Sequence, residues 1–243
     1  MPQSTAMNAR RGTLAARRLL FPGLMTAVMV LLLCALGTWQ VYRLQWKLAV
    51  LAQIAAAEQA PALPLTATPG PYQKVAVSGR FDYTKVALYG AEARDTKAGP
   101  TMGAYQLVPL MRDNAPPILV ERGWMPQPDT VPLSKPDGTV TVTGYVRPSE
   151  APHWFSPAAD LRERRFYTLD TDAIGIALGL PAPEPFVLVA LGPDSTSTFP
   201  IPAQHLPQPP NNHLSYAITW YGLAVAAIAV FVVWARKESR PAP

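Results

Sequence analysis

The residue with the clearest capacity for chemistry in this sequence is a histidine at the start of a long apolar segment. His213 stands in the stretch NNHLSYAITWYGLA and precedes an uncharged run, residues 214–234. Residues three or four positions apart share a face of a helix, so Tyr216, Ala217 and Trp220 follow along one stripe. An imidazole in that place is able to bind a metal ion or to satisfy a backbone group.

A second cluster of polar and aromatic side chains lies in the stretch GTWQVYRLQWK, at the end of another apolar run. Its members follow one another at steps of one, three, three and one, and this spacing places them on one stripe of a helix. They are Trp39, Gln40, Arg43, Trp46 and Lys47. An arginine in mid-bilayer costs about 2.5–3.5 kcal/mol on insertion scales. We therefore expect the helix to leave the hydrocarbon near Trp39 and to hold Arg43 and Lys47 at the headgroups.

These residue types leave two interpretations open. In one, the aromatic residues form an interfacial belt with snorkelling cations, and His213 helps Asn211 or Asn212 to cap a helix. In the other, His213 is an axial ligand of haem iron, aromatic rings cover the macrocycle, and Arg43 and Lys47 pair with its propionate groups. Spacing and composition alone do not decide between them.

Two apolar segments must position these residues, and they cover residues 21–44 and 212–234. The first has no charged residue between Arg18 and Arg43. About 20 helical residues cross a hydrocarbon core of about 30 Å, so both segments are predicted to be transmembrane helices. The first is too long for a cleaved signal peptide. The charged fraction of the chain, 15%, is low, which also favours a membrane protein.

The charges outside the two segments indicate the orientation of the chain. Residues 1–57 contain no acidic residue, and basic tails, 1–20 and 235–243, flank the segments. By the positive-inside tendency, both termini are predicted to be cytoplasmic and residues 45–211 to form a periplasmic domain on a cell inner membrane. The alternatives are a mitochondrial transit peptide, a single-pass secreted protein and a soluble protein with two buried helices. A basic cluster directly before an apolar run favours membrane lipid over nucleic acid as the partner.

Short β-rich runs separated by turn residues characterise the middle of the chain. The predicted strands lie within residues 74–82, 85–90, 103–111, 117–126, 139–148, 165–169 and 185–192, the first with a bend or bulge at Ser78-Gly79. One helix is predicted within residues 170–181, with Asp170 or Asp172 as its N-cap. The predicted fold is a mainly antiparallel β domain, barrel- or sandwich-like, between two transmembrane helices. No catalytic motif or phosphate-binding loop occurs, so we expect no enzyme activity.

These stretches also resemble the surfeit locus protein 1 family of cytochrome c oxidase assembly factors. The matching segments follow the family order and are LGTWQVYRLQWK (36–47), VSGRFD (77–82), VPL (108–110), ILVERGWMP (118–126), VTGYVRPSE (142–150) and NNHLSYAITWYGLA (211–224). The first and the last are the most specific. Two residues depart from the family pattern: Glu121 stands where a neutral residue, often Asn, is expected, and Tyr167 stands in place of a Trp.

The resemblance implies a two-span protein that helps to insert haem a into cytochrome c oxidase subunit I. His213 matches the histidine that is associated with haem a binding in bacterial members, so it becomes our predicted axial ligand of the haem iron. The geometry of the two stripes adds a predicted lining for the haem pocket. It consists of Trp39, Gln40, Arg43, Lys47, Trp220 and Tyr221.

The predicted partners are oxidase subunit I and the haem a synthase, as the resemblance implies, and membrane lipid, as the two apolar segments imply. A homo-oligomer or docking to the synthase would supply a second axial ligand. The alternative function is a scaffold without haem, which stabilises an oxidase assembly intermediate through its β domain. A haem-modifying enzyme is the third class. It would need more than one intramembrane histidine, and His213 is alone there.

Overall fold

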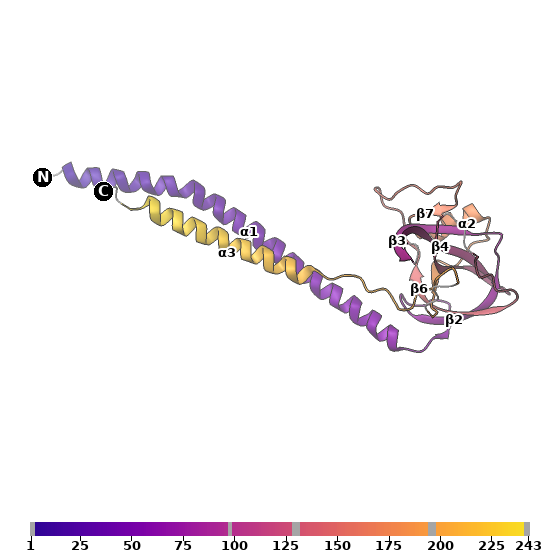
Figure 1. The fold of residues 1–243 in the computed structure, drawn as a ribbon. Coiled ribbons are helices and arrows are strands. Elements are labelled where there is room, and N and C mark those ends of the chain that lie inside the picture. Colours follow the sequence, from indigo (N-terminus) through magenta and orange to yellow (C-terminus); the bar gives the residue numbers. More distant parts are fainter. Residues whose placement is uncertain (1–2, 97–98, 128–131, 194–197, 241–243) are drawn as a thin grey trace. The chain divides into compact units, whose positions relative to one another are not determined.

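The computed structural model describes residues 3–96, 99–127, 132–193 and 198–240. Their helices and strands are α1 (Gln3–Gln59), β1 (Leu63–Pro64), β2 (Lys74–Phe81), β3 (Ala87–Thr96), β4 (Gly99–Arg112), β5 (Ala115–Pro126), β6 (Val140–Pro148), β7 (Arg165–Phe166), α2 (Thr171–Leu178), β8 (Phe186–Ala190) and α3 (His213–Glu238). The chain divides into two compact units (Figure 1). The helical unit comprises residues 1–52 and 208–243, and the β unit comprises residues 53–207.

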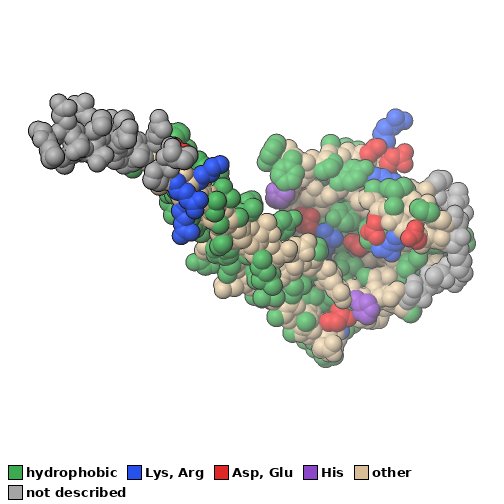
Figure 2. All heavy atoms as spheres, turned by 60° about the vertical axis from the view of Figure 1, so that its left-hand side comes forward, with side chains coloured by type: hydrophobic (Ala, Val, Ile, Leu, Met, Phe, Trp, Pro, Cys, Tyr) green, Lys and Arg blue, Asp and Glu red, His purple; other side chains and the backbone are tan. Residues whose placement is uncertain are grey.

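The helical unit consists of two long apolar helices. Leu19–Gln59 of α1 and His213–Glu238 of α3 are long and apolar enough to cross a membrane. Only 6% and 11% of their most apolar stretches are buried within the structure, and Figure 2 shows green apolar side chains on their surface. A core helix of a soluble protein would bury these side chains, so their exposure is consistent with the predicted transmembrane helices. α1 continues as a helix to Gln59, beyond Leu44, where the predicted span ends.

The two long helices pack along a repeat of alternating three- and four-residue steps. The less exposed series on α1 is Gly23, Thr26, Val30, Leu33, Gly37, Gln40, Leu44 and Lys47, and the series on α3 is His213, Ala217, Trp220, Ala224, Ala227 and Phe231. This spacing is typical of a coiled-coil seam. Gly23 faces Phe231 and Gly37 faces Tyr221, so the residue numbers run in opposite directions and the helices are antiparallel.

The β unit contains one mixed sheet of eight strands. Their order is β1-β2-β6-β8-β5-β4-β3-β7, and β2 also pairs with β4. β2 pairs with β6 from Lys74 to Gly79 and with β4 at Arg80 and Phe81. The strands β2, β6, β8, β5 and β4 are therefore joined in a closed circuit of pairings. β2 changes its partner directly after Gly79, the place where the sequence predicts a bend.

The seven predicted strands are confirmed in position, although β7 is limited to Arg165 and Phe166. β1 was not predicted, because two residues carry no alternating pattern. The pairings β1–β2, β3–β7 and β5–β8 are parallel, whereas β2–β4, β2–β6, β3–β4, β4–β5 and β6–β8 are antiparallel, so the sheet is mixed but, as predicted, mainly antiparallel. Parallel neighbours require a long crossover connection. The chain between β5 and β8 provides one, and it includes α2.

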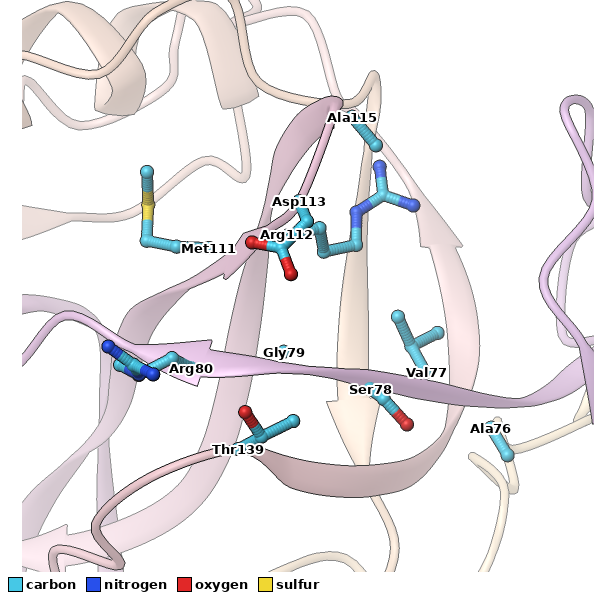
Figure 3. Close-up of a pocket in the computed structure, with 10 residues that line it drawn as sticks. All are labelled: Ala76, Val77, Ser78, Gly79, Arg80, Met111, Arg112, Asp113, Ala115 and Thr139. Carbon is cyan, nitrogen blue, oxygen red and sulfur yellow. The ribbon is translucent and has the colours of Figure 1, made fainter.

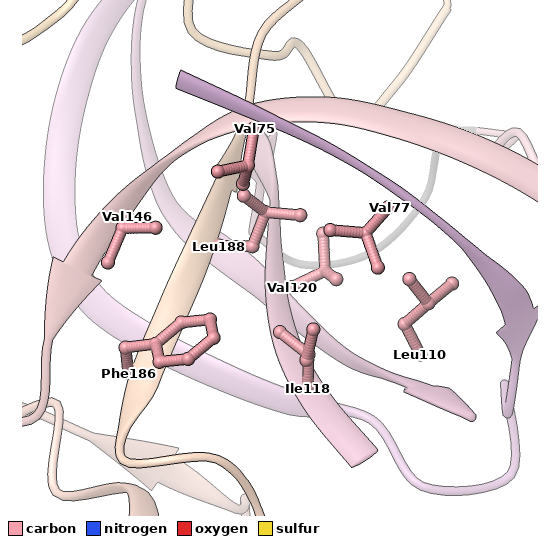
Figure 4. Packing of buried hydrophobic residues seen from close by; sticks show 8 residues of the cluster. All are labelled: Val75, Val77, Leu110, Ile118, Val120, Val146, Phe186 and Leu188. Atoms are coloured by element: carbon pink, nitrogen blue, oxygen red, sulfur yellow. The ribbon is translucent and has the colours of Figure 1, made fainter. Parts of the chain in front are cut away.

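Alternation along the strands produces two hydrophobic clusters in the β unit. The first, shown in Figure 4, contains Val75, Val77, Leu110, Ile118, Val120, Val146, Phe186 and Leu188; the second contains Ala87, Leu107, Leu119, Phe166, Leu169, Ile174, Leu178 and Val187. In β5, Ile118 and Val120 belong to the first cluster and Leu119 to the second, because successive side chains point to opposite faces. α2 supplies part of the second cluster. It begins after the predicted N-cap Asp170, whose carboxylate accepts hydrogen bonds from two backbone N–H groups.

Candidate functional site

The structure brings together two polar side chains of the apolar helices. His213 is the first residue of α3, and its Nδ1 lies 2.8 Å from Oε1 of Gln40 in α1. A carboxamide oxygen only accepts hydrogen bonds, so Nδ1 is the donor, and in the neutral ring Nε2 then keeps its lone pair. Gln40 is buried and His213 is half-buried. Metal-binding histidines have this arrangement, because a hydrogen bond from one ring nitrogen fixes the tautomer in which the other nitrogen binds the metal.

The imidazole of His213 is directed at α1 and does not cap its own helix. The N-cap residue of α3 is Asn212, whose side chain forms no capping hydrogen bond. The Oδ1 of Asn211 accepts a long hydrogen bond, 3.4 Å, from the backbone N–H of His213. Side-chain capping at this helix end is therefore limited to Asn211.

Small residues bring the two helices close enough for this contact. A Cβ atom at Gly37 would lie 3.0 Å from the ring of Tyr221, which is one of the predicted pocket residues. The hydroxyl groups of Thr38 and Tyr221 lie 2.9 Å apart, and Ala217 is buried on the same side of α3. Close backbone approach through small residues is common between transmembrane helices. The polar pair therefore lies beside a tight helix–helix contact.

Gly37→Leu is expected to push the two helices apart, because the added side chain has no space beside Tyr221. Spin labels at Leu32→Cys and Leu223→Cys, in a Cys34→Ser background, would report the change as a distance between the labels. Interaxial distances vary over about 2 Å with the side chains at the contact, so we expect an increase of that order and a broader distribution.

The matched control for this experiment is Gly222→Leu, one residue beyond the contact. A Cβ atom at Gly222 meets nothing within 4 Å, so the distance between the labels should stay unchanged. Equal distance distributions in the two variants would show that Gly37 does not set the helix separation.

The other predicted residues on the two stripes lie partly on the seam and partly on the exposed side of α1. Trp39 and Arg43 are exposed, and the Arg43 guanidinium lies 4.7 Å from the centre of the Trp46 ring. Lys47 and Trp220 are half-buried and belong to the repeat along which the helices pack. The predicted stripe of α1 therefore extends from the seam onto the neighbouring exposed surface.

Gly37 and Thr38 were not among the predicted site residues, although a glycine on the three- and four-residue repeat marks a possible close contact between helices. The same repeat locates the polar pair along the helices. From Gly23 to Gln40, α1 rises about 25 Å, which is close to the hydrocarbon thickness of about 30 Å. Because Gly23 faces Phe231 and Gln40 faces His213, the polar pair lies at one end of the apolar contact between the helices.

A cavity of about 560 Å³ lies in the β unit where β2 changes its partner. Figure 3 shows its lining, which includes Arg80, Arg112 and Asp113. Arg112 donates hydrogen bonds to the carbonyl oxygen of Pro116 and to the carboxylate of Glu184, at 2.6 and 2.5 Å. Arg112 therefore stabilises the fold by linking β4 to Pro116 and Glu184. Among the described residues, no group of three or more His, Cys, Asp or Glu side chains is placed to hold a metal ion.

A buried acidic residue lies in β5 of the β unit. The Glu121 side chain is 8% exposed, its Oε2 has no hydrogen-bond partner, and Nη1 of Arg147 is 4.0 Å away. Arg147 instead donates through Nη2 to Tyr89 and Glu150, at 3.0 and 2.9 Å. Burial raises the pKa of Glu121 to about 7, although the positive charges of Arg147 and Arg94 oppose this shift. The carboxyl group is therefore partly protonated near neutral pH.

Known proteins match most of this chain. A model of the SURF1 family matches residues 27–225. Over 214 residues the chain is 31% identical to the SURF1-like protein of Rickettsia conorii, and the match covers 85% of this chain and 88% of that protein. It is 33% identical over 229 residues to Surfeit locus protein 1 of Rattus norvegicus, covering 86% and 72%, and 31% identical over 230 residues to that of Homo sapiens, covering 86% and 74%. The region matched by the family model includes Gln40, His213 and the whole β unit.

Proposed function

The chain belongs to the SURF1 family, and from this premise we propose that it is a cytochrome c oxidase assembly factor that binds haem a through His213. The observation that carries the proposal is the hydrogen bond between His213 Nδ1 and Gln40 Oε1, which leaves Nε2 with its lone pair. In this proposal haem a is the cargo of the protein, and the protein performs no net chemistry on it.

The side chains near His213 fit a haem as cargo. A neutral imidazole nitrogen is a common axial ligand of haem iron. Gln40 holds the tautomer in which Nε2 is able to bind, and the half-buried ring of Trp220, two turns further along the same seam of α3, adds an apolar surface. Arg43 and Lys47 carry the positive charge that pairs with propionate groups.

Delivery of haem a requires reversible binding, and one protein ligand suits this better than two ligands in a closed core. The haem a synthase supplies the haem in this proposal, and oxidase subunit I receives it. A second axial ligand comes from a homo-oligomer or from docking to the synthase. Membership of the SURF1 family supports these partners.

The proposed orientation places both termini in the cytoplasm and the β unit on the periplasmic side of the cell inner membrane. The two candidate spans and the basic tails of the chain support it. Gln40 lies close to Leu44, where the predicted first span ends, and His213 is the first residue of α3. The site is then at the periplasmic leaflet, where haem a is received and released in the plane of the membrane.

His213→Ala is expected to remove haem a from the purified protein, because no other described histidine lies on the spans. The measurement is the reduced-minus-oxidised spectrum of the detergent-solubilised full chain from cells that make haem a. Gln40→Leu should weaken haem binding by about 10–100-fold, which is typical for loss of a hydrogen bond that orients a ligand. His205→Ala, in the β unit, is the matched control and should keep the haem a band.

Circular dichroism of each variant shows whether the protein is still folded. A His213→Ala variant that keeps the haem a band would contradict the assignment of the ligand. A wild-type protein without a band, although haem a is abundant in the cells, would contradict the role as a carrier. The scaffold without haem would then be the better function.

A further inference from the structure

The loop between β6 and β7 exposes apolar side chains that the proposed haem site does not use. Trp154 is 95% exposed and is the most exposed large hydrophobic side chain among the described residues. Phe155 and Leu161, in the same loop, are 69% and 68% exposed. Exposed apolar clusters on folded domains commonly mark an interaction surface. We call residues 151–164 the aromatic loop.

The two aromatic rings are presented by an ordered turn. His153 N–H donates to the Ser156 hydroxyl at 2.8 Å, and Ser156 N–H donates to the His153 carbonyl oxygen at 2.9 Å. Trp154 and Phe155 therefore form the tip of the turn. Their rings meet edge to face with centroids 5.2 Å apart, and the His153 ring stacks on Phe155 at 5.8 Å. These contacts hold the rings together outside the core of the domain.

A second tight turn presents the leucine. The backbone groups of Asp160 and Arg165 exchange hydrogen bonds at 2.9 and 2.8 Å. The carboxylate of Asp160 accepts hydrogen bonds from the N–H groups of Arg162 and Glu163, at 3.0 and 3.2 Å. Leu161 is therefore at the tip of a closed turn, next to a basic side chain. Both turns of the aromatic loop therefore expose an apolar tip and are closed by hydrogen bonds of their own.

We propose that the aromatic loop inserts the Trp154–Phe155 turn into the headgroup region of the bilayer in which the chain is anchored. Tryptophan and phenylalanine favour this region, and an arginine beside an apolar tip suits anionic lipid. The candidate spans bracket the β unit in the sequence, so in the proposed orientation the β unit is tethered to a lipid bilayer at both of its ends. Insertion would orient the β unit on the membrane surface. The inference rests on the membrane anchoring in the proposed function and is independent of haem a.

The test uses the full chain in vesicles of phosphatidylcholine and phosphatidylglycerol, with no partner protein present. Spin labels are placed at Phe155→Cys and, separately, at Leu161→Cys, both in a Cys34→Ser background. Their collision rates with oxygen, which is concentrated in lipid, and with a water-soluble nickel chelate are compared. Asp113→Cys, in the exposed β4–β5 turn, is the control in water, and Val225→Cys, on α3, is the control in lipid.

Insertion predicts that the labels at positions 155 and 161 collide severalfold more with oxygen and severalfold less with the chelate than the label at position 113. Trp154→Asp should remove this difference at both loop positions, because a charged tip does not enter the membrane. If the loop labels behave like the Asp113 control while the Val225 label lies in lipid, the inference is overturned, and the loop is a surface for a protein partner. A Val225 label in water would overturn the membrane anchoring itself.

Discussion

Gly123→Ala is expected to destabilise the β unit by about 4 kcal/mol, because two costs add at this position. Gly123 has a φ of +134°, a conformation that L side chains rarely adopt and that costs about 1–3 kcal/mol. The added Cβ would lie 2.0 Å from the carbonyl oxygen of Ile201, and overpacking costs about 1–3 kcal/mol more.

The neighbouring chain cannot move aside without losing other contacts. Trp124 N–H donates to the Ile201 carbonyl at 2.9 Å, and Ile201 N–H donates to the Trp124 carbonyl at 2.8 Å. β5 also has a bulge at Arg122, between the paired residues Glu121 and Gly123. A bulge leaves one residue without a partner and changes the local backbone angles. Glycine is therefore required at position 123 by both the bulge and the close approach of Ile201.

Thermal unfolding of the full chain in detergent, followed by circular dichroism, measures this effect. A loss of about 4 kcal/mol lowers the melting temperature by roughly 10 °C in a domain of this size. The matched control is Gly138→Ala. Gly138 also has a positive φ, +75°, but a Cβ atom there meets nothing within 4 Å, so only the backbone strain is expected. Equal losses in the two variants would show that Ile201 does not exclude a side chain at position 123.

Glu121→Gln is expected to remove a pH dependence of stability worth about 3 kcal/mol. The ordinary pKa of a glutamate is 4.5, and burial raises the pKa of Glu121 to about 7 in the folded state. Folding therefore takes up a proton between these values. The stabilisation is complete below pH 4.5 and is lost as the pH rises through 7. Glutamine has a similar shape and stays uncharged, so the variant should be the more stable protein at pH 8.

The charged groups around Glu121 explain why the shift is upward. Desolvation by burial raises its pKa most, and Glu92 in β3 adds to this, whereas Arg147 in β6 and Arg94 in β3 lower its pKa by less. Nη1 of Arg147 is 4.0 Å away, and Nη2 of the same arginine is bound to Tyr89 and Glu150. The arginine therefore compensates the buried carboxylate only in part.

Urea unfolding of the wild type and of Glu121→Gln at pH 5 and pH 8 tests this prediction. The free energy of unfolding of Glu121→Gln should exceed that of the wild type by more at pH 8 than at pH 5. Glu150→Gln is the control, because Glu150 binds the same Arg147 from an exposed position. If the free energy of unfolding of the wild type does not decrease from pH 5 to pH 8, relative to that of Glu121→Gln, the burial of a titrating carboxyl group is contradicted.

Much of the fold was predictable from local patterns in the sequence. Three of these patterns depend only on neighbouring residues: the apolar segments at both ends, the alternation in residues 118–120 and the Asp170 cap. The structure confirms the helices and strands that they predict. The parallel pairings of β8 with β5 and of β7 with β3 were not predictable in this way. Pairing depends on contacts between residues that are distant in the sequence, and hydrophobic periodicity carries no information about the partner strand.

The sequence by itself determined the two long apolar helices, the β-rich middle and the family, and it singled out His213 as a candidate ligand, because composition and motif order are properties of the chain. Only the tertiary structure decided that Gln40 faces His213 while Trp39 and Arg43 are exposed, since this depends on how each helix is rotated about its axis at the seam. Likewise, only the tertiary structure decided that Glu121 is buried. Its burial depends on the bulge in β5 and on the strands beside it. A side chain acquires its environment from residues that fold against it, and those lie far from it in the sequence.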